Sequence, residues 1–186
     1  MSDSEDPTPD RTPSGPLLLL GDSLTEAGPW EEAFSDRQVI NAGRTGDTTA
    51  DVAARIDEVV AAKPSTVVVM AGTNESRRAT VEQVVRGLED ILFQLRHELP
   101  DAHLLVCSVL PRERERADWI REVNIHVRQF APTVKADFVD LWPAFAEEDG
   151  ELRADLTTDR LHLTDAGYAA WVEQLRGGVP LETRDR

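Results

Sequence analysis

The sequence predicts an α/β protein, a three-layer αβα sandwich in which helices cover both faces of a five-stranded parallel sheet. Two observations predict this fold class. Five apolar, strand-like runs alternate with amphipathic helix patterns along the chain, and three of the runs are almost continuously apolar. Strands that are buried on both faces of a parallel sheet have this pattern. Because repeated strand–helix units make right-handed crossovers, five strands favour the order 2-1-3-4-5.

The strand candidates are short runs, and the first, third and fourth are the nearly continuous ones. The five runs cover residues 16–20, 38–42, 66–70, 103–110 and 136–141. The order 2-1-3-4-5 is the flavodoxin-like arrangement of an open sheet. In such sheets, ligands bind outside the carboxyl ends of the strands, at the point where the strand order reverses.

Four helix patterns separate or follow these strands. They cover residues 48–63, 80–99, 116–130 and 164–177. Each pattern places apolar residues at a spacing of three or four, which predicts one buried face. Thr80 and Thr164 stand where an N-cap is expected, and Pro64, Pro100 and Gly177 stand where helices commonly end.

The chain of 186 residues has the size of one domain. We expect residues 16–179 to form it, between a disordered, acidic and proline-rich tail at 1–15 and a short C-terminal tail at 180–186. No apolar stretch approaches the roughly 18 residues that a membrane span requires, and the N-terminus lacks the features of a secretory signal. The single cysteine, Cys107, lies in an apolar run, which suits the reducing cytoplasm that we expect as the location.

The formal net charge of -15 argues against binding to nucleic acid or to an anionic membrane surface. Only Lys63 and Lys135 are lysines, so 18 of the 20 basic residues are arginines (20 minus 2). Coding bias and adaptation to high salt both explain an acidic, lysine-poor composition, and both remain open. We expect no metal and no cofactor, since a single cysteine argues against a cysteine-based metal site.

Glycine and small polar residues follow the first three strand candidates. Gly21-Asp22-Ser23 follows the first, "GRTGDTT" the second and "GTNE" the third. In the order 2-1-3 these strands are neighbours, so Ser23, Gly46 and Asn74 are expected at one rim of the sheet. Taken singly, each residue is explained by a turn or a helix cap, and only their convergence indicates a site.

A fourth segment, "DRLH", precedes the last helix pattern. Asp159 and His162 are three positions apart, so the carboxylate can bend back to the imidazole Nδ1–H and leave Nε2 free. His162 then becomes the candidate general base for Ser23. Asp22 adjoins Ser23 but points to the opposite side of an extended segment, so we expect it to bind the local backbone and shape the turn.

These four segments resemble the motif blocks of the SGNH, or GDSL, hydrolases, which carry Ser, Gly, Asn and His in that order. "GDSL" matches the first block, "GRTGDTT" the second, "GTNE" the third and "DRLH" the last, over about residues 17–176. "VVVMAGTNE", "SVLPRE" and "RLHLTDAGY" look most like the brain-type platelet-activating-factor acetylhydrolase catalytic subunits and their bacterial acetylesterase relatives. "LPRERERADW" departs from these relatives, which commonly have glycine after the arginine, so the shape of this loop is open.

The resemblance implies the SGNH hydrolase fold and a serine esterase for short, acetyl-like acyl groups. Ser23 would attack the ester, His162 would take its proton and Asp159 would stabilise the imidazolium. The amides of Ser23 and Gly46 and the side chain of Asn74 would form the oxyanion hole.

The residues that line the acyl pocket in these relatives match Leu24 and Leu161. Two bulky side chains there imply a short pocket that prefers acetyl to long acyl chains. The alternative, in which both leucines simply pack in the core, remains open.

The same segments fit other enzyme classes less well. A phosphotransferase of the haloacid-dehalogenase kind is disfavoured, because it needs a second aspartate where Leu24 stands. The α/β-hydrolase fold of the interfacial lipases is also disfavoured, because Thr25 occupies the last position of the Gly-x-Ser-x-Gly elbow that this fold uses. A thioesterase or lysophospholipase on the same fold stays open, as does a catalytically silent binding module. We expect a small-molecule ester as the partner, and a monomer or a homodimer.

Overall fold

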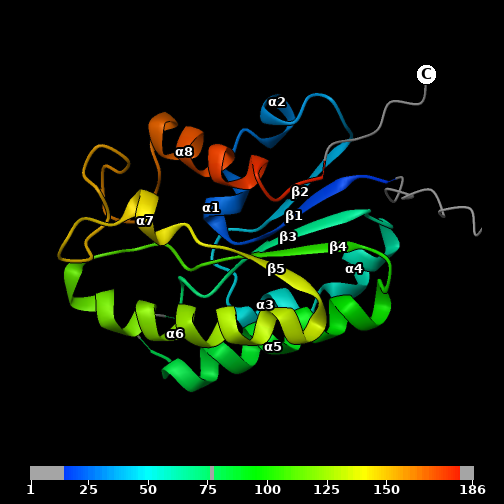
Figure 1. Ribbon diagram of the computed structural model, residues 1–186, viewed down its shortest axis with the longest axis horizontal. Coiled ribbons are helices and arrows are strands. Elements are labelled where there is room, and N and C mark those ends of the chain that lie inside the picture. The colour runs from blue at the N-terminus through cyan, green and yellow to red at the C-terminus, as the bar shows by residue number, and fades with distance from the viewer. Residues whose placement is uncertain (1–14, 76–77, 181–186) are drawn as a thin grey trace, which may run out of the picture.

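The computed structural model describes residues 15–75 and 78–180 (Figure 1). The expected tails at 1–15 and 180–186 lie outside these ranges, apart from Gly15 and Pro180. Five parallel strands form one sheet of order β2-β1-β3-β4-β5, which confirms the predicted fold class and strand order. The strands are β1 Leu17–Gly21, β2 Val39–Gly43, β3 Thr66–Met70, β4 His103–Cys107 and β5 Ala136–Val139.

Helices lie on both faces of this sheet (Figure 1). One face carries α3 Thr49–Ala53, α4 Ile56–Ala61, α5 Val81–Glu98 and α6 Ala117–Phe130. The other carries α1 Ser23–Glu26, α2 Trp30–Ala33 and α8 Asp165–Arg176. The short helix α7 Trp142–Phe145 and the 3-10 turns Arg114–Arg116 and Ala131–Val134 complete the described chain. None of the helices within the described ranges is long and apolar enough to cross a membrane.

The sheet separates two apolar clusters, and β1 contributes to both. Leu18 and Leu20 pack with the helices α3 to α6, whereas Leu17 and Leu19 pack with α1, α2 and α8. All four leucines are at most 1% exposed. This two-sided burial explains why the run is continuously apolar instead of alternating, since each buried leucine stabilises the fold by about 1.5–3 kcal/mol.

Two long helices begin where the sequence predicts. The Thr80 hydroxyl accepts a hydrogen bond from the amide of Gln83, and the Gln83 side chain accepts one from the amide of Thr80, which forms a capping box at the start of α5. At the start of α8, the Thr164 hydroxyl accepts a hydrogen bond from the amide of Gly167. The caps therefore fix both helix starts.

The single helix predicted over 48–63 is wrong, because the structure divides it into α3 and α4. Arg55 lies at the break with φ −119° and ψ 21°, outside helical geometry. Its side chain is buried and hydrogen-bonds to the strand end at Gly21 and to Asp47. These inward bonds compete with a continuous helix and account for the break.

Two strands end earlier than the runs at 103–110 and 136–141 predict. Beyond Cys107, hydrogen bonds from side chains to the backbone take the place of the hydrogen bonds between strands. The Asn124 side chain binds the amide and the carbonyl of Val109, at 2.7 and 2.9 Å, and the Ser108 hydroxyl accepts from the amide of Leu141 at 2.9 Å. The apolar run continues because these residues are buried, although they no longer pair as strands.

Candidate active site

The turn after β1 presents Ser23 at the N-terminus of α1. Asp22 is the N-cap, and its Oδ1 accepts a hydrogen bond from the amide of Leu24 at 2.9 Å, which confirms the role predicted for Asp22. Gly21 is required by close packing, because a Cβ there would lie 2.2 Å from Thr25 Oγ1 and 2.3 Å from the carbonyl of Met70. Ser23 itself stays partly exposed at the rim of the sheet.

The loop after β2 carries Gly46 with φ +86°, a conformation that side chains rarely adopt. A Cβ at this position would meet nothing within 4 Å, so the space beside the Gly46 backbone is open. On one side of Gly46, the carboxylate of Glu26 accepts hydrogen bonds from the amide and the hydroxyl of Thr45. The loop is therefore held by hydrogen bonds on one side of Gly46 and leaves open space where a side chain would stand.

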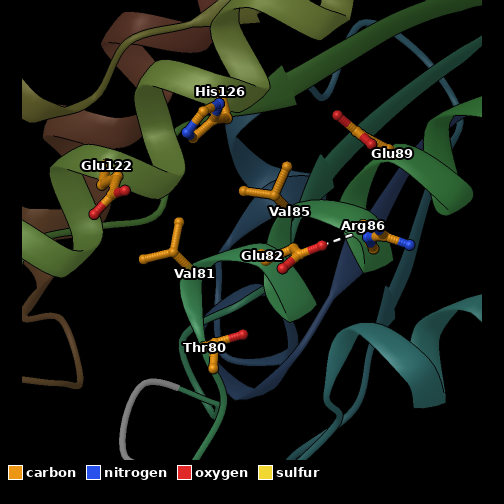
Figure 2. Close-up of a pocket in the computed structure, with 8 residues that line it drawn as sticks. All are labelled: Thr80, Val81, Glu82, Val85, Arg86, Glu89, Glu122 and His126. Carbon is orange, nitrogen blue, oxygen red and sulfur yellow. Dashed lines mark ion pairs between the residues drawn. The ribbon is translucent and has the colours of Figure 1, made fainter.

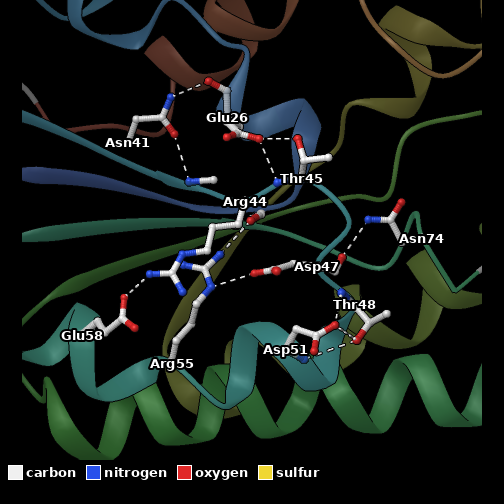
Figure 3. Close-up of polar contacts among 12 residues, drawn as sticks. Glu26, Asn41, Arg44, Thr45, Asp47, Thr48, Asp51, Arg55, Glu58 and Asn74 are labelled. Atoms are coloured by element: carbon white, nitrogen blue, oxygen red, sulfur yellow. Dashed lines mark hydrogen bonds and ion pairs between the residues drawn. The ribbon is translucent and has the colours of Figure 1, made fainter.

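Asn74 follows β3 and lies beside this loop. Its Nδ2 donates to the carbonyl of Asp47 at 2.8 Å (Figure 3). The next residue, Glu75, accepts from the amide of Thr49 at 2.5 Å. The structure therefore brings Asn74 to Asp47, the residue that follows Gly46.

The loop before α8 pairs Asp159 with His162. The Nδ1 of the imidazole lies 2.7 Å from Oδ2 of Asp159, while Oδ1 accepts from the amides of Leu161 and His162 at 2.9 and 2.7 Å. These bonds, the imidazole contact first, lower the pKa of Asp159 to about 2. Asp159 is thus a carboxylate at neutral pH, and it holds the ring so that Nε2 remains available.

Contacts of α8 tie the histidine loop to the serine turn. The hydroxyl of Tyr168 donates to the carbonyl of Leu24 at 2.9 Å, and Trp171 packs edge-to-face on Trp30 at 4.9 Å between ring centroids. Within the ranges that the structure describes, no hydrogen bond joins the hydroxyl of Ser23 to His162. In enzymes, such a contact often tightens only when substrate binds.

The two residues expected in the acyl pocket contact one apolar cluster. Leu24 is 1% exposed and belongs to the cluster that α1, α2 and α8 share. Leu161 is partly buried and packs against the same cluster. Leu24 follows Ser23 and Leu161 precedes His162 in the chain, and Leu24 also serves as core.

Buried charges beneath the rim are the feature that the sequence analysis missed. Burial, together with the smaller effect of the nearby carboxylates of Glu75 and Asp47, raises the pKa of Asp22 to about 6. Arg55 lies among these groups with its side chain only 6% exposed. The sequence did indicate that Arg55 is buried, because it stands between Val52 and Val59 at helical spacing, on the face of the helix pattern that packs inward.

A separate groove lies between α5 and α6 (Figure 2). It has a volume of about 470 Å³ and is lined by Glu82, Glu89, Glu122 and His126 among others. None of the predicted catalytic residues lines it. Within the described residues, no group of three or more histidine, cysteine, aspartate or glutamate side chains is arranged to hold a metal ion.

Residues 19–170 match the model of the GDSL-like Lipase/Acylhydrolase family. The chain belongs to this family. It is 32% identical over 178 residues to platelet-activating factor acetylhydrolase IB subunit alpha2 of Rattus norvegicus, which covers 90% of this chain and 74% of that protein. The family membership makes the chain a hydrolase and confirms the resemblance on which the sequence analysis relied.

Two solved structures share the fold. A GDSL-like lipase of Bacteroides thetaiotaomicron superposes with a TM-score of 0.77 at 21% identity, covering 89% of each chain. An acetyl xylan esterase superposes with a TM-score of 0.72 at 20% identity, covering 89% of this chain and all of that one. At these identities the likeness shows the fold alone, and it agrees with the observed sheet.

Proposed function

We propose that this hydrolase is a serine esterase that cleaves short-chain esters, acetyl esters foremost, through an acyl-serine intermediate. The observation that carries the proposal is the Asp159–His162 pair at 2.7 Å, in a loop whose helix is bonded to the residue next to Ser23. A serine hydroxyl is a weak nucleophile unless a base takes its proton. His162, held by a carboxylate, is that base.

The reaction proceeds in two halves. Ser23 Oγ attacks the carbonyl carbon as its proton passes to His162 Nε2, and Asp159 stabilises the imidazolium. The carbonyl oxygen becomes an oxyanion that the amides of Ser23 and Gly46 and the Nδ2 of Asn74 stabilise. The C–O bond to the alcohol then breaks, and His162 protonates the leaving alcohol. Water, activated by the same imidazole, attacks the acyl-serine and releases the acid.

The preference for short acyl groups rests on Leu24 and Leu161. Both pack against the cluster beneath the serine turn, so a long acyl chain would have to displace core side chains. The relative from Rattus norvegicus that is 32% identical is named as an acetylhydrolase subunit, which agrees with this preference. Opening the pocket by Leu161→Ala should therefore raise the relative rate on longer esters.

The substrate is expected to be a small-molecule ester and the location cytoplasmic, with Cys107 fully buried as a free thiol. Whether the working form is a monomer or a homodimer does not affect the chemistry proposed.

The test compares p-nitrophenyl acetate with the octanoate ester, in wild-type protein and in Ser23→Ala. We expect faster turnover of the acetate and a loss of activity in the variant by at least ~10³-fold. Equal rates on the two esters would refute the short pocket. Faster cleavage of acyl thioesters or lysophospholipids would instead favour the thioesterase or lysophospholipase alternative, and no turnover of any ester would favour a silent binding module.

A further inference from the structure

Arg55 is a buried cation at the break between α3 and α4. Its Nε donates to Oδ2 of Asp47 at 2.7 Å, and its Nη2 donates to the carbonyl of Gly21 at 2.9 Å (Figure 3). The arginine side chain is 6% exposed and that of Asp47 is 16% exposed. These contacts therefore form inside the protein, where solvent screens them little.

The two acceptors belong to the segments that carry the oxyanion-hole donors. Gly21 ends β1 two residues before Ser23, and Asp47 directly follows Gly46. The backbone carbonyl of Asp47 in turn accepts from Nδ2 of Asn74 at 2.8 Å. One guanidinium thus touches the Ser23 and Gly46 segments directly and reaches Asn74 through a single residue.

The shape of the guanidinium lets this link hold two segments at a fixed distance. It is planar and rigid, and two of its nitrogens bind two different segments, so it fixes the separation between them. Arg44 adds a second tie, because its amide also donates to the carbonyl of Gly21, at 3.0 Å. Its side chain, by contrast, makes an exposed ion pair with Glu58.

We propose that Arg55 is a positioning residue for the oxyanion hole, which sets the spacing between the three donors without touching substrate. This inference rests on the proposed esterase function. Hydrogen-bond donors stabilise an oxyanion only when they are aimed at the place where it forms. Displacing them weakens stabilisation of the transition state while leaving the binding of the uncharged ester almost unchanged.

The test measures kcat and KM on p-nitrophenyl acetate for Arg55→Met and Arg55→Lys, with Arg44→Met as the matched control. For Arg55→Met we expect kcat to fall by ~10–100-fold and KM to change by less than about threefold. Lysine keeps the charge but cannot bridge both acceptors, so Arg55→Lys should lose about tenfold in kcat. Arg44→Met should stay within about twofold of wild type.

A double-mutant cycle separates positioning from general loosening. If Arg55 acts through the oxyanion donors, Asn74→Ala should cost much less in kcat when Arg55 is already methionine than it does in the wild type. Fully additive losses would overturn the proposal. So would wild-type kcat in a folded Arg55→Lys, or an equal loss of kcat in Arg44→Met.

The folded fraction of each variant is measured by circular dichroism and urea unfolding. If Arg55→Met does not fold, the positioning role is tested with Arg55→Lys and with the double-mutant cycle of Arg55→Lys and Asn74→Ala. Failure of the esterase proposal has a different signature, because wild-type protein would then show no turnover that depends on Ser23. An active wild type with unaffected Arg55 variants would refute only the positioning role.

Discussion

At the scale of single residues, Asp159 shows how one carboxylate can do two tasks. Its Oδ2 faces the imidazole of His162, and its Oδ1 binds two backbone amides that shape the loop. Because the pKa of Asp159 is lowered to about 2, its side chain stays a carboxylate across the pH range in which enzymes are assayed. A change of this side chain therefore tests the chemistry more than the fold.

We predict that Asp159→Asn lowers kcat by ~10²–10⁴-fold. Asparagine can keep the oxygen that binds the amides, but it turns an NH2 group toward Nδ1 and favours the tautomer with the proton on Nε2. That nitrogen could then no longer accept the proton of Ser23. The measurement is kcat on p-nitrophenyl acetate, with Asp155→Asn as control, since Asp155 lies in the same loop and makes an exposed ion pair with Arg153. Similar rates for the two variants would contradict the role of Asp159.

Asp22 is a residue whose ionisation opposes folding. Its side chain is fully buried, and its pKa is raised to about 6 from an ordinary 3.8. The folded state therefore favours the protonated form. The stability of the fold with a protonated Asp22 is therefore fully present below the pKa of the unfolded chain, and part of it is lost as the pH rises through about 6 and the buried carboxyl ionises.

We predict that Asp22→Asn is more stable than wild type at about pH 8, by up to about 3 kcal/mol. Asparagine mimics the neutral carboxyl and keeps an oxygen that can accept from the amide of Leu24. The advantage should shrink as the pH is lowered from about 7 to about 4. Urea unfolding at several pH values measures it, and a variant no more stable than wild type at about pH 8 would show that burial does not penalise this charge.

At this scale, short motifs were enough to name Ser23, Gly46, Asn74, Asp159 and His162 as candidates, because residue type and spacing are visible in the sequence; their catalytic roles stay predictions. Arg55 and the buried state of Asp22 were not predicted. Their roles depend on which distant backbone groups they meet, such as the carbonyl of Gly21, and a local pattern does not contain that information.

At the scale of elements, α8 is the support of the histidine loop and α1 that of the serine. Tyr168 joins them through its hydrogen bond to the carbonyl of Leu24. Burial raises the pKa of Tyr168 to about 12, so its hydroxyl stays a donor at any working pH. The contact is thus independent of pH in the assay range.

We predict that Tyr168→Phe costs about 1–3 kcal/mol of stability, because it leaves a buried carbonyl without its partner. It should also lower kcat several-fold, since α1 loses a tie to α8. Thr80→Ala is the control: it removes the cap of α5, costs about 1 kcal/mol and should leave kcat unchanged. If both variants lose stability but neither loses activity, the contact between α1 and α8 does not position the serine.

The long elements were predictable and the short ones were not. Helices α5, α6 and α8 span several turns with an apolar face, so their periodicity is visible in the sequence. Helices α1, α2 and α7 have four residues each, too few to show a period. The break between α3 and α4 was missed because it depends on the tertiary contacts of Arg55, which override a continuous helical pattern.

At the scale of the whole molecule, the order of the strands explains why the site could be located. The alternation of strands and helices predicts β2, β1 and β3 as neighbours, and the structure confirms it. Three segments separated by tens of residues thereby end at one rim. The histidine loop returns to the same rim because α8 packs on α1.

The net charge of -15 gives a prediction at this scale. If coding bias explains the composition, added salt should only screen repulsion between surface carboxylates. The melting temperature should then rise by a few degrees up to about 0.3 M NaCl and level off, since the Debye length is already below about 10 Å. A steep rise that continues to molar salt, measured by differential scanning fluorimetry, would indicate adaptation to high salt instead.

The central claim is that Ser23 is the residue that becomes acylated, and a fluorophosphonate probe tests it most directly. Wild-type protein is treated with the probe, digested and mapped by mass spectrometry, with Ser23→Ala and His162→Ala treated in parallel. The account predicts one adduct, on Ser23, which is absent from the alanine variant and slowed by at least ~10²-fold without His162. An adduct on another residue, or full ester turnover by Ser23→Ala, would contradict it.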